Sequence, residues 1–137
     1  MRRCWFQRRR MFYPIIDEVI MEIQRIDIRP GCSRVVIHNH VAYFTGHVAA
    51  GRQPTLREQT AAVCARYDEL FAQFGLRKEN ILMANCFLKN IKDFQEYADV
   101  FNEWTGGENP PAGCCVQAEL EESDCLLELA LIVAVDD

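Results

Sequence analysis

The first clear pattern in the sequence is a pair of short apolar runs around a polar centre. Residues 35–37 and 41–44 are apolar, and His38-Asn39-His40 lies between them. Asparagine tolerates the positive φ that a tight turn between antiparallel strands requires. The pattern therefore predicts a β-hairpin between Arg34 and Phe44.

A long one-sided helix is expected next. Thr55 and Glu58 have the spacing of a capping box, in which the threonine hydroxyl accepts from a helix-start amide and the glutamate reaches back to the threonine amide. Apolar residues then recur every three or four positions as far as Phe74. Gly75 supplies the residue type that ends helices in the left-handed conformation. We expect a helix of about twenty residues.

The second half of the chain predicts a strand and a shorter helix. Residues 81–88 form an apolar run that is typical of a strand covered on at least one face. Residues 93–104 have the start signal and spacing of a helix. Asp93 is the expected cap of this second helix.

Two closing strands complete the predicted fold. A breaker cluster at residues 106–111 precedes apolar runs at 114–116 and 126–135, which flank the acidic turn 121–124. The predicted order is β-β-α-β-α-β-β. Strands grouped around two helices favour an α+β fold, a mixed sheet with both helices on one face. Because the strands are apolar at nearly every position, we expect self-association to cover the other face.

Composition places the chain among single globular domains: 137 residues, 50% apolar and 26% charged. Seven cysteines form an odd set without a CxxC pair, and no secretory apolar segment precedes them, so we expect reduced thiols in a cytoplasmic protein without a bound metal or cofactor. No apolar run reaches the roughly 18 residues of a membrane span.

The charge distribution separates the start of the chain from the rest. The net charge is −5, yet the first ten residues hold five arginines and no acidic residue. An acidic body disfavours nucleic acid as a partner. The basic start has three interpretations: a transit-like segment, an arm that touches nucleic acid or a membrane, or a dispensable extension. We expect residues 1–20 to be a disordered or dispensable extension ahead of a domain at residues 21–137.

Short motifs recur in a recognisable order at residues 43–48, 59–60, 79–81, 88–94, 109–112 and 127–129. In order and spacing these segments resemble the RidA/YjgF family of reactive-intermediate deaminases. The resemblance implies a chorismate-mutase-like fold that forms a trimeric barrel with ligand clefts between subunits. Family members hydrolyse reactive 2-imino and enamino acids to 2-oxo acids and ammonia. The expected partners are a small ligand of that kind and further copies of the chain, not nucleic acid or a membrane.

The chain departs from the family at the residue that would hold the substrate. In active members an arginine follows Pro-Ala, and its planar guanidinium meets a carboxylate with two parallel hydrogen bonds. This chain has Gly113 at that position. The expected replacements are the Gly113 amide, Arg34 or Arg52.

Three functions stay open on this basis. The first is a divergent imine or enamine deaminase, and the second is the same chemistry on a neutral or differently charged substrate. The third is a non-catalytic trimer that uses the intersubunit cleft to bind a regulatory ligand.

Glu128 is the predicted catalytic residue, because it matches the family's acidic residue that positions the attacking water. Its alternative is a solvent-facing glutamate of an edge strand. Cys115 matches a cysteine common in the family's cleft, although a thiol without nearby positive charge is better interpreted as apolar filler. Tyr43 completes the predicted ligand-binding residues. His47, which replaces the family's usual glutamine, is either a cleft residue or a core-edge histidine.

Overall fold

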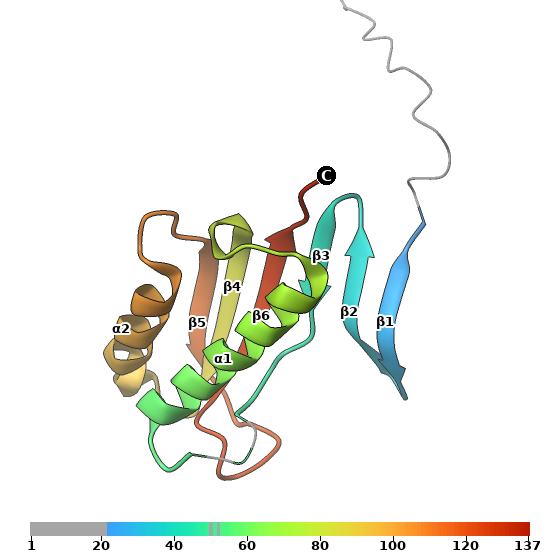
Figure 1. Cartoon of the computed structure of the whole chain (residues 1–137). Coiled ribbons are helices and arrows are strands. Elements are labelled where there is room, and N and C mark those ends of the chain that lie inside the picture. Colours follow the sequence, from blue (N-terminus) through green and yellow to red (C-terminus); the bar gives the residue numbers. More distant parts are fainter. Residues whose placement is uncertain (1–21, 50, 52) are drawn as a thin grey trace, which may run out of the picture.

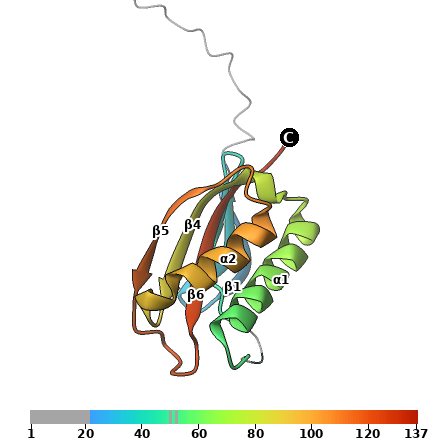
Figure 2. The ribbon, with the colours of Figure 1, turned by 90° about the vertical axis from the view of Figure 1, so that its left-hand side faces the viewer.

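Two helices lie on one face of a six-stranded mixed sheet (Figures 1 and 2) in the computed structural model, which describes residues 22–49, 51 and 53–137. The sheet order is β1-β2-β3-β6-β4-β5, and among these strands only β4 and β5 pair in parallel. The predicted α+β fold with both helices on one face is therefore confirmed. The elements are β1 (Gln24–Arg29), β2 (Cys32–His38), β3 (Val41–Phe44), α1 (Leu56–Phe74), η2 (Lys78–Asn80), β4 (Ile81–Leu88), η3 (Ile91–Asp93), α2 (Phe94–Thr105), β5 (Ala112–Gln117) and β6 (Leu127–Ala134).

Strand β1 was not predicted, so the order begins with three strands instead of two. It pairs antiparallel with β2, and all of its residues except the half-buried Ile26 are exposed. Charged and apolar residues alternate along it, but only two positions, Ile26 and Ile28, are apolar, which is a weak strand signal. An edge strand forms because a neighbouring strand offers hydrogen-bond partners, and this contribution is invisible in the propensity of its own residues. The predicted extension, residues 1–20, lies outside the described residues.

The hairpin and the long helix form as the sequence indicates. Asn39 and His40 both have positive φ, 50° and 59°, as a two-residue hairpin turn requires. At the start of α1, the Glu58 amide donates to the Thr55 hydroxyl over 3.2 Å and the Thr55 amide donates to the Glu58 carboxylate over 3.1 Å. Gly75 ends the helix with φ 65°.

The start of α2 differs from the prediction. Asp93 precedes the helix, but its side chain makes no capping hydrogen bond. Instead the short turn η3 leads directly into α2, and the Asn90 side chain accepts from the Lys92 amide over 3.1 Å. The Phe94 amide, at the start of α2, donates to the Ile91 carbonyl of this turn. It therefore does not need a side-chain cap as its acceptor.

Strand β6 runs through the middle of the sheet and separates its two faces. Alternate residues from Leu127 to Val133 are fully buried beneath the helices. The intervening residues from Glu128 to Ala134 are half-buried on the opposite face, which no helix covers (Figure 2). We call this the uncovered face. It also bears Tyr43 with 45% of its surface exposed, so it presents apolar side chains to water.

No helix in the described ranges combines the length and the hydropathy that crossing a membrane requires.

Candidate functional site

Glu128 lies on the uncovered face, where a missing side chain makes room for it. Its neighbours Leu127 and Leu129 are buried beneath the helices, so strand alternation points Glu128 the other way. A Cβ atom placed on Gly46 would lie 2.0 Å from the Glu128 carboxylate oxygen Oε1. Position 46, which follows Thr45 in the matching segment 43–48, therefore requires glycine, because any side chain there would displace the carboxylate.

The segment Thr45–His47 connects Glu128 to Arg34. The His47 amide donates to the Leu129 carbonyl over 2.9 Å, and the Leu129 amide donates back to the His47 carbonyl over 3.0 Å. On the other side, the Thr45 amide donates to the Arg34 carbonyl over 3.0 Å. The Arg34 guanidinium reaches the His47 ring, which packs beside Tyr67 on the helix side. Glu128 and Arg34 thus flank one short segment.

Arg34 is held by two partners. Its Nε donates to the Asp27 carboxylate over 2.6 Å, and its Nη1 lies 3.4 Å from His47 Nε2. The hydrogen bonds from Arg34 and then Arg29 lower the pKa of Asp27. Within the described part of the chain, no hydrogen bond is formed by Arg34 Nη2. Arg52, the other predicted replacement, lies outside the described residues.

His47 is a buried, neutral histidine that orients Arg34. Its ring is 5% exposed and packs 4.9 Å from the ring of Tyr67. Nδ1 lies 2.8 Å from the Thr45 carbonyl oxygen, which only accepts, so Nδ1 carries the hydrogen and Nε2 is left to accept from Arg34. Burial lowers the pKa of His47, which favours this neutral form.

Cys115 faces the helices, away from Glu128. It pairs with the buried Cys86, whereas Glu128 pairs with Phe87, the next residue along β4. The two side chains therefore point to opposite faces, on strands about 10 Å apart. Within one protomer, therefore, the Cys115 thiol does not lie beside Glu128. Burial raises the pKa of the Cys115 thiol, in line with the interpretation as apolar filler.

The close approach of β4 requires glycine at position 113. A Cβ atom at this position would lie 1.9 Å from the Ala84 carbonyl oxygen, which belongs to the backbone and cannot rotate aside. Gly113 therefore does not simply lack the family's arginine. The backbone of β4 leaves no room for any side chain at this position. No signal in the sequence around Gly113 indicates this contact, since it depends on the register of β5 with β4.

Tyr43 lies on the uncovered face but not beside Glu128. It pairs with Ile132, which is four residues from Glu128 along β6, or about 13 Å. One protomer therefore divides the predicted residues. Glu128 and Arg34 lie on either side of the segment 45–47, Tyr43 lies farther along the face of Glu128, and Gly113 and Cys115 lie on the helix side of the edge strand β5.

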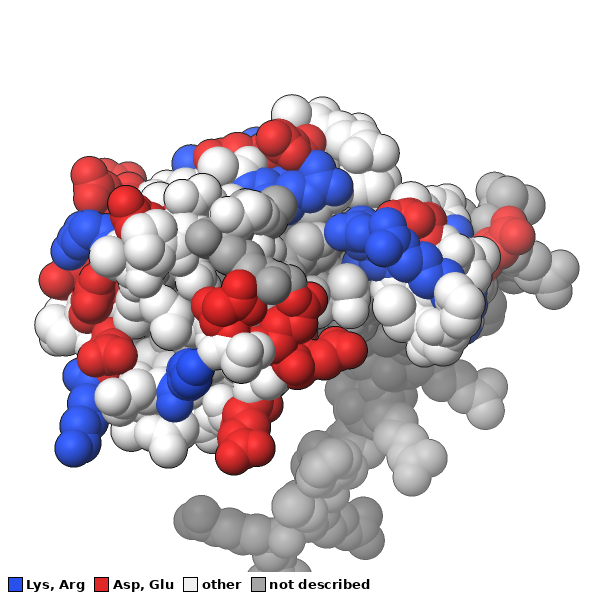
Figure 3. Space-filling view, turned by 90° about the horizontal axis from the view of Figure 1, so that it is seen from below, with Lys and Arg blue, Asp and Glu red and all other residues white. Residues whose placement is uncertain are grey.

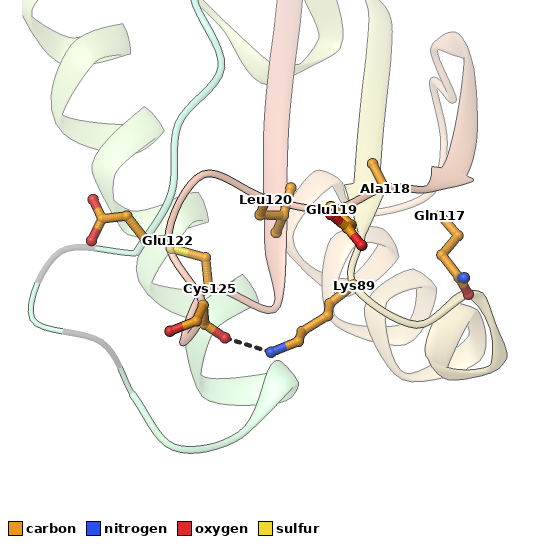
Figure 4. Close-up of a pocket in the computed structure, with 8 residues that line it drawn as sticks. Lys89, Gln117, Ala118, Glu119, Leu120, Glu122 and Cys125 are labelled. Carbon is orange, nitrogen blue, oxygen red and sulfur yellow. Dashed lines mark hydrogen bonds between the residues drawn. The ribbon is translucent and has the colours of Figure 1, made fainter.

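A hollow of about 600 Å³ lies under the loop between β5 and β6 (Figure 4). Lys89 enters it and donates to the Ser123 carbonyl, while Glu119 and Glu122 also line it. Acidic side chains gather near the middle of this underside (Figure 3). This charge disfavours a carboxylate ligand, so the hollow does not fit the predicted 2-imino acid. Sequence reasoning had interpreted residues 121–124 only as a turn.

The described residues contain no group of three or more histidine, cysteine or acidic side chains placed to hold a metal ion. The six cysteines in the same part of the chain are free thiols.

Comparison with known proteins identifies the family. The family model described as Endoribonuclease L-PSP matches residues 22–135. A RutC family protein of Haemophilus influenzae is 36% identical over 113 residues, 82% of this chain and 97% of the relative. The RutC family protein YoaB of Escherichia coli is 35% identical over 115 residues, 84% and 100% of the two chains. The crystal structure of a YjgF family member from Neisseria meningitidis, 29% identical, superposes with a TM-score of 0.80 over 86% and 98% of the two chains. The chain therefore belongs to the RidA/YjgF family.

Proposed function

We propose that this protein is a homotrimeric deaminase that hydrolyses the C=N bond of a reactive 2-imino or enamino acid at Glu128. The position of the Glu128 carboxylate is the observation that carries the proposal. It lies over Gly46 on the uncovered face, beside the segment that also holds Arg34. A carboxylate next to an open face can orient a water molecule toward a bound ligand.

The proposed reaction uses the Glu128 carboxylate and the Arg34 guanidinium. Water adds to the imine carbon and Glu128 accepts its proton as the C–O bond forms. Glu128 then passes this proton to the nitrogen, and the remaining hydroxyl proton follows as the C–N bond breaks, so that ammonia leaves and the C=O bond of the 2-oxo acid forms. Arg34 Nη2, which forms no hydrogen bond among residues 22–49, 51 and 53–137, supplies a donor for the substrate carboxylate in place of the family arginine.

Trimerisation is part of the proposal because the protomer separates the predicted site residues. Gly113 and Cys115 lie on the edge strand β5, whereas Glu128 lies on the uncovered face. A closed head-to-tail assembly mates two different surfaces of each copy. The β5 edge of one copy can then approach the Glu128 side of the next, and the apolar uncovered face is buried as well.

A second candidate is a non-catalytic trimer that binds a ligand in the same cleft. Gly113 favours it, because the contact with the Ala84 carbonyl excludes the arginine that anchors substrates in active relatives. Cytoplasmic location belongs to either proposal, since the free thiols suit a reducing compartment.

The deciding experiment measures imine hydrolysis. An imino acid is generated in situ by an amino acid oxidase, and the semicarbazide-trappable imine is followed with and without the protein. We expect Glu128→Gln to lower the rate on the order of a hundredfold. Glu121→Gln, at an exposed loop position, serves as the matched control and should keep the full rate.

Each result bears on one part of the proposal. Imine decay no faster than in buffer would contradict the deaminase and leave the ligand-binding trimer, which a shift in melting temperature with added 2-oxo acid would then support. Light scattering at micromolar concentration tests the assembly, and a monomer would contradict both candidates.

A further inference from the structure

A second hollow, of about 320 Å³, lies between α2 and β5 and is open to solvent. These two elements are neighbours in both ribbon views (Figures 1 and 2). The volume is at the lower end of the range for small-molecule sites. Within one protomer the hollow is separate from Glu128, because it lies on the helix side of the sheet.

The lining of this hollow is aromatic and small. Phe94, Tyr97 and Phe101 contribute rings from α2, and Pro110 and Pro111 contribute theirs from the segment before β5. Phe94 has 44% of its surface exposed, so part of the apolar lining already faces water. Burying that surface against a ligand is favourable in proportion to the area removed from water.

No acidic or basic side chain and no histidine is among the lining residues that the structure describes. A charged ligand group that entered would lose its hydration without gaining a partner, which is costly. Its polar side chains are Asn102, the Tyr97 hydroxyl and the Cys115 thiol, whereas the Cys114 thiol points to the other face and donates to Asn85. A few polar groups in an apolar hollow suit orientation of a ligand more than neutralisation of its charge.

Gly113 keeps the floor of the hollow uncharged. Because its Cβ position is blocked by the Ala84 carbonyl oxygen at 1.9 Å, the residue that carries positive charge in active relatives has no room here. The contact between Gly113 and the Ala84 carbonyl therefore disfavours a carboxylate in the hollow and leaves space for an apolar group.

We infer that the hollow between α2 and β5 is a binding site for an uncharged, apolar group of a small molecule, of the size of an aromatic ring or a branched aliphatic chain. This inference does not depend on imine hydrolysis at Glu128. It predicts that recognition on this side of the sheet selects against charge.

Two probes that share a ring and differ in charge test the site. The full chain is titrated with phenylacetamide and with phenylacetate, and backbone amide shifts are followed by NMR. We expect saturable shifts in β5 and α2 with phenylacetamide, and at least tenfold weaker binding of phenylacetate. Equal affinity for the two probes, or shifts that do not saturate, would overturn the inference.

A filling variant locates the binding. Ala98 is half-buried on the wall of the hollow, so Ala98→Phe should fill it and weaken phenylacetamide binding at least tenfold. Ala72→Phe makes the same substitution at an exposed position of α1 and should leave the affinity unchanged. If both variants bind like the wild type, the probe binds elsewhere and the site is refuted. The imine assay is read separately, so neither result decides the other.

Discussion

The contact at Gly113 makes a quantitative prediction for Gly113→Ala. The added methyl carbon would lie 1.9 Å from the Ala84 carbonyl oxygen, whereas carbon and oxygen in contact are separated by about 3.3 Å. Strand β5 must therefore move away from β4 by roughly 1.4 Å, a strain that overpacking data place at 1–3 kcal/mol. Because the obstacle is backbone, we expect the upper part of this range, about 2–3 kcal/mol.

The lost free energy of unfolding corresponds to a measurable fall in the melting temperature. For a chain of 137 residues, each kcal/mol lowers the melting temperature by about 3.5 °C, so Gly113→Ala should melt about 7–10 °C below the wild type. Gly113→Arg carries the same clash, so we expect it to lose stability without gaining activity. Melting is compared at equal protein concentration, because assembly also changes the melting temperature.

Gly46→Ala is the matched control for this reasoning. Its new methyl group meets the Glu128 side chain, which can rotate aside, so the free energy of unfolding should fall by less than about 1 kcal/mol. The two alanine variants then separate a backbone obstacle from a side-chain obstacle. If Gly113→Ala melts within about 2 °C of the wild type, β5 does not press on Ala84 and our explanation of the glycine is wrong.

Two further predictions concern local stability. Thr55→Ala removes the hydroxyl that accepts from the Glu58 amide and should lower the free energy of unfolding in urea by about 1 kcal/mol, whereas Thr55→Ser should not. Burial lowers the pKa of His47, so as the pH falls below about 6.5 the unfolded chain takes up a proton that the folded chain does not, and stability declines. His47→Gln should lose less stability than the wild type between pH 7 and 5, and parallel declines would contradict the neutral buried ring.

Local signals predicted the elements that depend on nearby residues. Thr55 with Glu58, and Asn39 within the turn, act through backbone groups a few positions away, and both are confirmed. Strand β1 was missed because its stability comes from pairing with β2. The α+β class followed from the grouping of strands around helices, which does not require knowledge of each edge strand.

The site was harder to predict because its distances depend on register. Glu128 and Gly46 were both singled out through their motifs, and the structure brings them into contact. Glu128 and Cys115 were both expected in a cleft between subunits, and within one protomer pairing with β4 turns their side chains to opposite faces. The family motif specifies which residues are present. The face to which each side chain points depends on how β5 and β6 pair with β4, the strand between them.

The central place of β6 has a consequence for how the chain is made. This strand is the last element of the sequence, yet it joins β3 to β4 in the middle of the sheet. During synthesis, the hairpins of the first half and the helices can form early, but the two halves of the sheet have no common neighbour until β6 has been made. The sheet is therefore completed only when β6 inserts, and removal of this strand would split the core instead of trimming an edge.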